Sequence, residues 1–183
     1  MNTAIKNRIV ALGGDYHFGG STLESDLRGI DLPKSYLIKG FEDFLQDTMY
    51  EKLAEGQPVL DAEISYPRMH FQKRLFTPFK KGTDDHTEFG DLDESMIREV
   101  VGKESLEFMI VGETDSFPNF YFVCLSDQDR ENPVLYSTDH ECFFEEITVE
   151  GTLQDFFHLL VSEEDYCEVV NQLTAVLQAE KEQ

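Results

Sequence analysis

The chain has 183 residues, a formal net charge of −22 and a composition that is 40% hydrophobic, with 15 Phe and 7 Tyr. This length is typical of one domain, and the aromatic content provides a packed core, which excludes intrinsic disorder despite the high charge. The charge also argues against binding to nucleic acid or to an anionic membrane, because phosphates would be repelled. We therefore expect one folded domain over 1–183 whose partner is a basic protein.

The beginning of the chain and its cysteines predict a cytoplasmic location. The apolar run before Gly13 is too short for a secretory signal or a membrane span. Cys124, Cys142 and Cys167 are odd in number and lack a C-x-x-C spacing. This pattern favours reduced thiols that act as small hydrophobic residues.

The first third of the chain is predicted to be irregular over 1–30 and helical afterwards. Asp31, Leu32 and Pro33 resemble a helix start, with Asp as the cap and Pro in the first turn. Apolar residues then recur every three or four positions and form one helical face, which ends near Gly56. These residues are Leu37, Phe41, Phe44, Leu45, Met49 and Leu53.

The middle of the chain is predicted to be mixed. Asp91 to Glu94 form a capping pattern that predicts a short helix over 91–101. The whole stretch 58–103 is either an insertion or part of the core sheet. Within it, 64–83 has basic residues and no acid, and we interpret it as a solvated strand or loop that neutralises acidic neighbours.

Strand signals dominate the next part and predict an antiparallel meander. The expected strands are 106–111, 119–125, 133–137 and 143–149. Capping patterns that begin at Thr152 and Ser162 then predict two helices, the second over 163–181. The expected fold class is α+β, with a central antiparallel sheet of about four to six strands and helices before and after it.

Acidic residues gather in the C-terminal third, where no Lys or Arg occurs between Arg130 and Lys181. Repulsion without local compensation costs stability, so this region is a candidate surface for a basic partner. The alternative is an ordinary solvated surface. The predicted contact residues are Glu141, Glu145, Glu146, Asp155, Glu163, Glu164 and Asp165.

No pattern in the sequence indicates catalysis, a metal or a cofactor. His140 and Cys142 are two residues apart but lack a third group to orient the histidine, and with Cys124 they lack a fourth zinc ligand. The acidic loop that begins at Asp127 has Asn132 where an EF-hand needs Gly. We therefore expect no enzymatic activity.

Several segments resemble the SUKH superfamily, which contains fungal cell-wall regulators and bacterial toxin-immunity proteins. The matching segments are Asp31–Tyr36 with Phe44 and Leu45, Ile110–Gly112, Asn119–Val123, Pro133–Tyr136, and Thr152 and Leu153 with Phe156 and Phe157. The resemblance implies an α+β fold without enzymatic activity. It also implies an immunity protein that neutralises a toxin, often a nuclease or a deaminase. The alternative is a regulatory or scaffold module that binds a protein other than a toxin.

Overall fold

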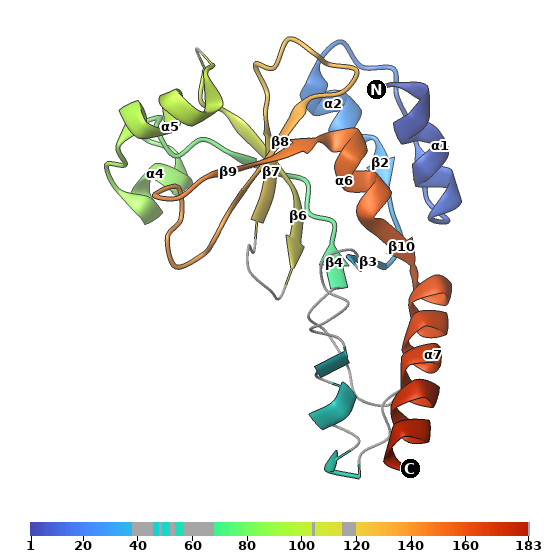
Figure 1. Ribbon diagram of the computed structural model, residues 1–183. Helices are drawn as coiled ribbons and strands as arrows, with labels where there is room; N and C mark the ends of the chain where they lie inside the picture. The colour runs from blue at the N-terminus through green and yellow to red at the C-terminus, as the bar shows by residue number, and fades with distance from the viewer. Residues whose placement is uncertain are drawn as a thin grey trace.

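The computed structural model describes residues 1–37, 46–47, 49–51, 54–56, 68–103, 105–114 and 120–182 (Figure 1). Its helices are α1 (Thr3–Ala11), α2 (Leu23–Arg28), α4 (Asp84–Phe89), α5 (Glu94–Val101), α6 (Leu153–Leu159) and α7 (Glu163–Lys181). Its strands are β1 (Asp15–Tyr16), β2 (Ile30–Asp31), β3 (Ser35–Leu37), β4 (Arg68–His70), β5 (Arg74–Phe76), β6 (Phe108–Thr114), β7 (Phe120–Cys124), β8 (Val134–Thr138), β9 (Thr148–Thr152) and β10 (Leu160–Ser162).

Eight strands form one antiparallel sheet in the order β10-β3-β4-β6-β7-β8-β9, and β5 also pairs with β6. The strands β6 to β9 follow each other in sequence and in space, which confirms the predicted meander. The strands β1 and β2 form a separate small sheet. The α+β class is confirmed, but the sheet has more strands than predicted, and α4 and α5 lie between β5 and β6 in the sequence rather than before or after all the strands.

Both faces of the central strands are buried, because successive side chains point to opposite sides of a sheet. In β6, Phe108 packs in one core and its neighbour Met109 in the other. In β7, Tyr121 and Phe122 divide in the same way. The continuous apolar runs of these strands thus serve two separate cores, one on each face of the sheet.

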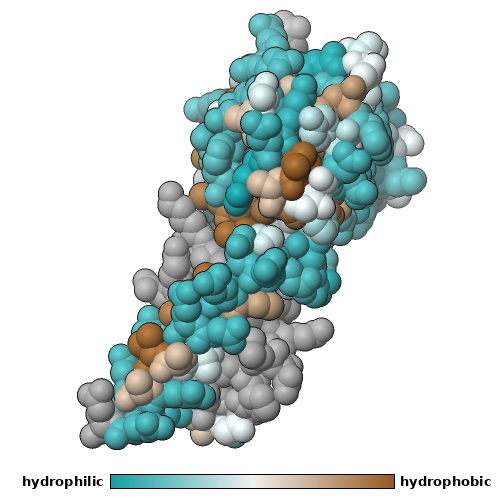
Figure 2. Space-filling model, turned by 90° about the vertical axis from the view of Figure 1, so that its right-hand side faces the viewer, coloured by the Kyte–Doolittle hydropathy of each residue, from teal (hydrophilic) through white to brown (hydrophobic). Residues whose placement is uncertain are grey.

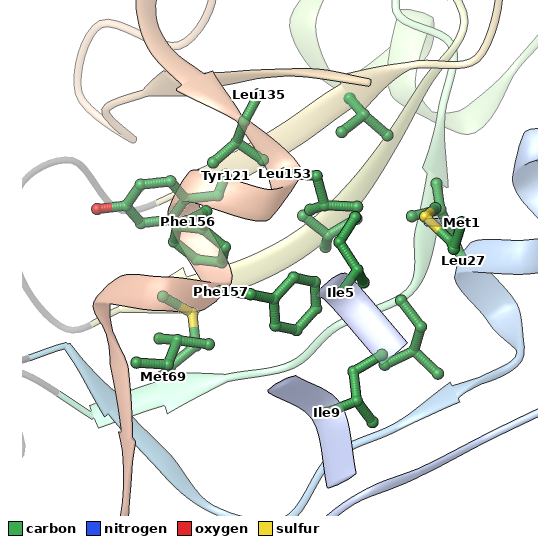
Figure 3. Packing of buried hydrophobic residues seen from close by; sticks show 14 of the residues in the cluster. Met1, Ile5, Ile9, Leu27, Met69, Tyr121, Leu135, Leu153, Phe156 and Phe157 are labelled. Atoms are coloured by element: carbon green, nitrogen blue, oxygen red, sulfur yellow. The ribbon is translucent and has the colours of Figure 1, made fainter. Parts of the chain in front are cut away.

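The first core lies beneath α1, α2 and α6 (Figure 3). Ile5 and Ile9 of α1 are fully buried, and α1 begins at Asn2, whose side chain accepts a hydrogen bond from the Ile5 amide. Phe156 and Phe157 of α6 lie on the sheet side of this layer. The prediction of an irregular segment over 1–30 is therefore wrong, since its apolar residues form helices that cover the sheet.

The second core lies on the opposite face and is mainly aromatic. It joins Phe76, Phe108 and Phe122 of the strands to Ile97 of α5 and to Phe144 of the β8–β9 loop. The predicted strand over 143–149 is wrong for 143–147, because β9 begins only at residue 148. The rings of Phe143 and Phe144 both point into the aromatic core, whereas in a strand they would lie on opposite faces of the sheet.

The helix predicted after Pro33 is also contradicted at its start, since Asp31 ends β2 and Ser35 begins β3. Pairing of β3 with β4 and β10 outweighs the local capping signal. The predicted helix residues Phe41, Phe44, Leu45 and Leu53 lie outside the described residues. Met49 is buried in a third cluster with residues of α7.

Helix α7 begins at Glu163, as predicted, and extends away from the sheet (Figure 1). Its first turn is fixed to the sheet by Tyr166, which stacks on Tyr36 of β3 with 3.9 Å between ring centroids. Of the stretch 58–103, the described part contributes β4, which lies between β3 and β6. The strands β4 and β5 of this stretch therefore belong to the core sheet, and α4 and α5 follow them as helices.

Candidate protein-binding site

The seven predicted contact residues fall in three separate places. Glu141, Glu145 and Glu146 are exposed in the loop between β8 and β9, on the side of the aromatic core. Asp155 is exposed on α6, and three acids are exposed in the first turn of α7. The last are Glu163, Glu164 and Asp165. The structure therefore does not bring the predicted residues into one surface.

Local roles account for several of the acids outside the loop. Asp155 completes the capping box of α6 with Thr152, and the hydrogen bond from that hydroxyl holds the pKa of the carboxyl below its ordinary value. Asp165 accepts a hydrogen bond from the Ser162 hydroxyl at 2.8 Å. Glu163 pairs with the exposed Lys34 at 3.0 Å. The face with α1, α6 and α7 is mainly hydrophilic (Figure 2).

The β8–β9 loop is held in a defined shape by Thr138. The Thr138 hydroxyl donates a hydrogen bond to the Glu146 carbonyl at 2.8 Å and accepts one from the buried Phe144 amide at 3.0 Å. Phe143 stacks on Phe89 with a centroid separation of 4.6 Å, and Phe144 stacks on Phe76 at 5.2 Å. The loop is therefore anchored by two rings while its glutamates face solvent.

Phe144 has a left-handed backbone with φ of 61°, the only such residue other than glycine in the described part of the chain. This conformation costs about 1–2 kcal/mol for an L-residue. The turn directs two consecutive rings into one aromatic cluster, which an extended strand does not allow. Burial of the Phe144 ring offsets the backbone strain.

A hollow of about 450 Å³ lies between this loop and the start of α5. We call it the acidic hollow. It is lined by Asp91, Leu92, Asp93, Met96, Phe144, Glu145 and Glu146. Four of these residues are carboxylates, three are apolar and none is basic. Met96 is 56% exposed and extends the apolar part to the surface of α5.

Two groups in or near the acidic hollow have shifted pKa values, and the causes differ. The Ser95 hydroxyl donates a hydrogen bond to Asp93 at 2.6 Å and lowers the pKa of that carboxyl below its ordinary value. The pKa of the nearby Cys142 thiol is raised, first by burial and then by the negative charges of Glu146 and Glu145. The Ser95 hydrogen bonds therefore favour the ionised form of Asp93, while burial and the nearby glutamates disfavour the thiolate of Cys142.

A second hollow of about 350 Å³ lies on the same side of the sheet. We call it the arginine hollow. It is lined by Gln72, Arg74, Glu88, Phe89, Glu113, Phe120, His140 and Phe143. Its apolar part is a set of packed rings, with 5.1 Å between the centroids of Phe120 and Phe143.

Sequence reasoning identified Glu145 and Glu146 of the acidic hollow but not its other half. Asp91 and Asp93 were interpreted as a helix-capping signal, which is correct for Asp93, the N-cap of α5. The capping pattern carries no information that α5 faces the β8–β9 loop. In the structure, two apolar residues of α5, Met96 and Val100, are exposed.

The alternative chemical sites considered from the sequence are not assembled in the structure. His140 and Cys142 lie in the β8–β9 loop, and Cys124 is buried, with its thiol hydrogen-bonded to the Ser105 carbonyl. Asp127 accepts hydrogen bonds from the amides of Asp129 and Val134, as a turn residue does. Within the described ranges there is no group of three potential ligands that could hold a metal ion.

Comparisons with known proteins give no relative. No protein-family model matches the chain, and searches of curated proteins and of solved structures find no match either. None of the helices in the described part of the chain is both long enough and apolar enough to span a membrane.

Proposed function

We propose that this chain is a non-enzymatic protein-binding domain that holds a basic partner at the acidic hollow, and that it acts as an immunity protein against a toxin. The observation that carries the proposal is the acidic hollow itself, which is lined by four carboxylates and three apolar residues. A Lys or Arg side chain has the matching form, since its charged head needs carboxylates and its stem needs apolar contact.

The shape and field of the loop support this role. The Thr138 hydrogen bonds and the two buried rings fix the loop before any partner arrives, so that little conformational entropy is lost on binding. A net charge of −22 attracts a basic protein over long range and raises its association rate. The raised pKa of the Cys142 thiol disfavours its use as a nucleophile.

The SUKH resemblance is the reason for proposing a toxin as the partner of this surface. In bacterial members of that superfamily, the α+β domain binds a toxin, often a nuclease or a deaminase. Proteins that act on nucleic acid carry basic surfaces, because they must approach phosphates. An acid-lined hollow of this kind competes for that surface.

The test begins with affinity capture of the partner by the full chain in its source cells. Binding of the purified partner is then measured by stopped-flow kinetics with two double variants that change net charge equally. Glu145→Lys with Glu146→Lys alters the acidic hollow, and Glu163→Lys with Glu164→Lys alters the start of α7. We expect the first pair to slow association about tenfold or more, and the second to slow it much less.

Two results would contradict the proposal. One is an equal effect of both pairs in folded proteins, which would mean that net charge and not the hollow determines association. The other is growth of cells that express the captured partner without this chain, since a toxin must arrest them. The second result would leave a regulatory or scaffold module as the function.

A further inference from the structure

Helix α5 carries an apolar sector that is wider than the face it buries. Ile97 and Val101 are buried against the aromatic core, whereas Met96 is 56% exposed and Val100 is 42% exposed. At about 100° per residue, these four side chains occupy one sector of roughly 140° around the helix. Half of this sector packs on the core, and the other half lies on the surface, where a helix of a soluble domain usually has polar residues.

The exposed half of the sector adjoins the acidic hollow. Met96 lines the hollow together with Glu145 and Glu146 of the β8–β9 loop. Val100 follows Met96 by one turn of α5, so the two side chains are neighbours on the helix surface. We call Met96, Val100 and the acidic hollow together the α5 face. A cation that enters the hollow therefore has apolar surface directly beside it.

The α5 face presents side chains rather than backbone groups. The backbone of α5 forms its hydrogen bonds within the helix, and in the loop Thr138 already binds the Phe144 amide and the Glu146 carbonyl. An extended segment of a partner needs backbone groups to pair with, as in strand addition to a sheet edge. A helix satisfies its own amides and carbonyls, and it can therefore dock through side chains alone.

Charge distinguishes between the possible occupants of this face. Exposed Asp93 and Glu99 flank the two apolar residues of α5, in addition to the glutamates of the hollow. A second copy of this chain would bring a further net charge of −22, and an anionic membrane would also be repelled. A basic segment of another protein is complementary to the face.

We propose that a basic amphipathic helix of the partner docks on the α5 face. Its Lys or Arg enters the acidic hollow, and its apolar residues cover Met96 and Val100. This inference rests on the proposed function and names the form of the contact. The carboxylates act on the association rate, whereas the apolar contact is made only in the bound state and slows dissociation.

The test uses designed peptides in place of the partner. The probe is a peptide of about 18 residues, long enough to populate a helix, built from Lys, Leu and Ala with the Leu residues on one helical face. Two control peptides have the same composition: one has no apolar face, and the other alternates apolar residues and Lys as a strand does. We expect the helical peptide to bind the full chain about tenfold more tightly than either control. In a ¹⁵N NMR titration it should shift the amides of Met96, Val100 and Glu145.

The diagnostic variant is Met96→Gln with Val100→Thr, which removes the exposed apolar groups without a change in net charge. Its dissociation rate from the helical peptide should rise about tenfold, and its association rate should stay within about twofold. The matched control is Val10→Thr with Val176→Thr, because these valines of α1 and α7 are 57% and 53% exposed. The control should leave both rates unchanged, and melting curves verify that each variant is folded.

Three results overturn the inference: binding of the alternating peptide as tight as that of the helical one, amide shifts away from the α5 face, or an unchanged dissociation rate in the Met96, Val100 variant. None of them concerns the charge reversals of Glu145 and Glu146, which test the proposed function with the captured partner. If those reversals have no specific effect while the peptide results stand, the proposed function fails and the helix-binding face remains. The two failures are therefore distinguishable.

Discussion

Replacement of Thr138 by Val should destabilise the protein by about 2–3 kcal/mol. The side chain keeps its shape and loses the hydroxyl, so the buried Phe144 amide and the Glu146 carbonyl both lose a partner. An unsatisfied buried donor costs about 1–3 kcal/mol, and a partly exposed neutral hydrogen bond contributes about 0.5–1.5 kcal/mol. For a protein of this size, the loss corresponds to roughly 4–12 °C in Tm.

Urea unfolding gives the free energy, and hydrogen exchange at the Phe144 amide shows whether the loss is local. Thr138→Ser is the control, because it retains the hydroxyl and removes only a methyl group; it should lose less than half as much stability as the Val variant. A Thr138→Val protein within 0.5 kcal/mol of the parent, with the Phe144 amide still protected, would refute the view that this hydroxyl holds the loop.

Two further predictions concern charge near the acidic hollow. In a Glu145→Gln, Glu146→Gln variant, the pKa of the Cys142 thiol should fall, because two of the charges that raise it are removed. Alkylation of Cys142 by iodoacetamide at pH 8 should therefore become faster. An unchanged alkylation rate would contradict the effect of the two glutamates on this thiol. Ser95→Ala should raise the pKa of Asp93 toward its ordinary value, as measured by NMR titration. The sign follows from the lowered pKa, because the stabilising effect of the Asp93 carboxylate is present above the ordinary carboxyl pKa and is lost as pH falls through the lowered one.

The sequence predicted best those elements whose signals are local. Capping patterns at Thr152 and Ser162 placed α6 and α7 correctly, since an N-cap is satisfied by amides within its own turn. The apolar runs of β6, β7 and β8 were recognisable because both faces of these strands are buried. In these helices and strands, the local sequence pattern and the burial in the fold favour the same secondary structure.

Where the prediction failed, contacts distant in sequence decided the structure. The capping pattern at Asp31 predicts a helix, but pairing of β3 with its neighbours forms a strand there instead. The run at Phe143 and Phe144 has the composition of a strand, but the left-handed backbone of Phe144 turns both rings into the core. Helix α1 was missed because only Ile5 and Ile9 of its residues are buried, and they gain this burial from contacts distant in sequence. Local propensity is weak beside such burial.

The candidate site shows the same division between local and distant information. Acid enrichment pointed to Glu145 and Glu146, since composition is visible in the sequence itself. The approach of Asp91 and Met96 to those glutamates depends on how α5 packs against the aromatic core.

Burial of both faces of the sheet also affects how substitutions in this protein combine during evolution. Adjacent residues such as Phe108 and Met109 belong to different cores, and the backbone layer between the cores keeps their side chains from sharing contacts. Substitutions without shared partners combine additively, so epistasis between the two cores should be weak. Substitutions on the side of the acidic hollow should therefore leave the packing of the opposite core largely unchanged.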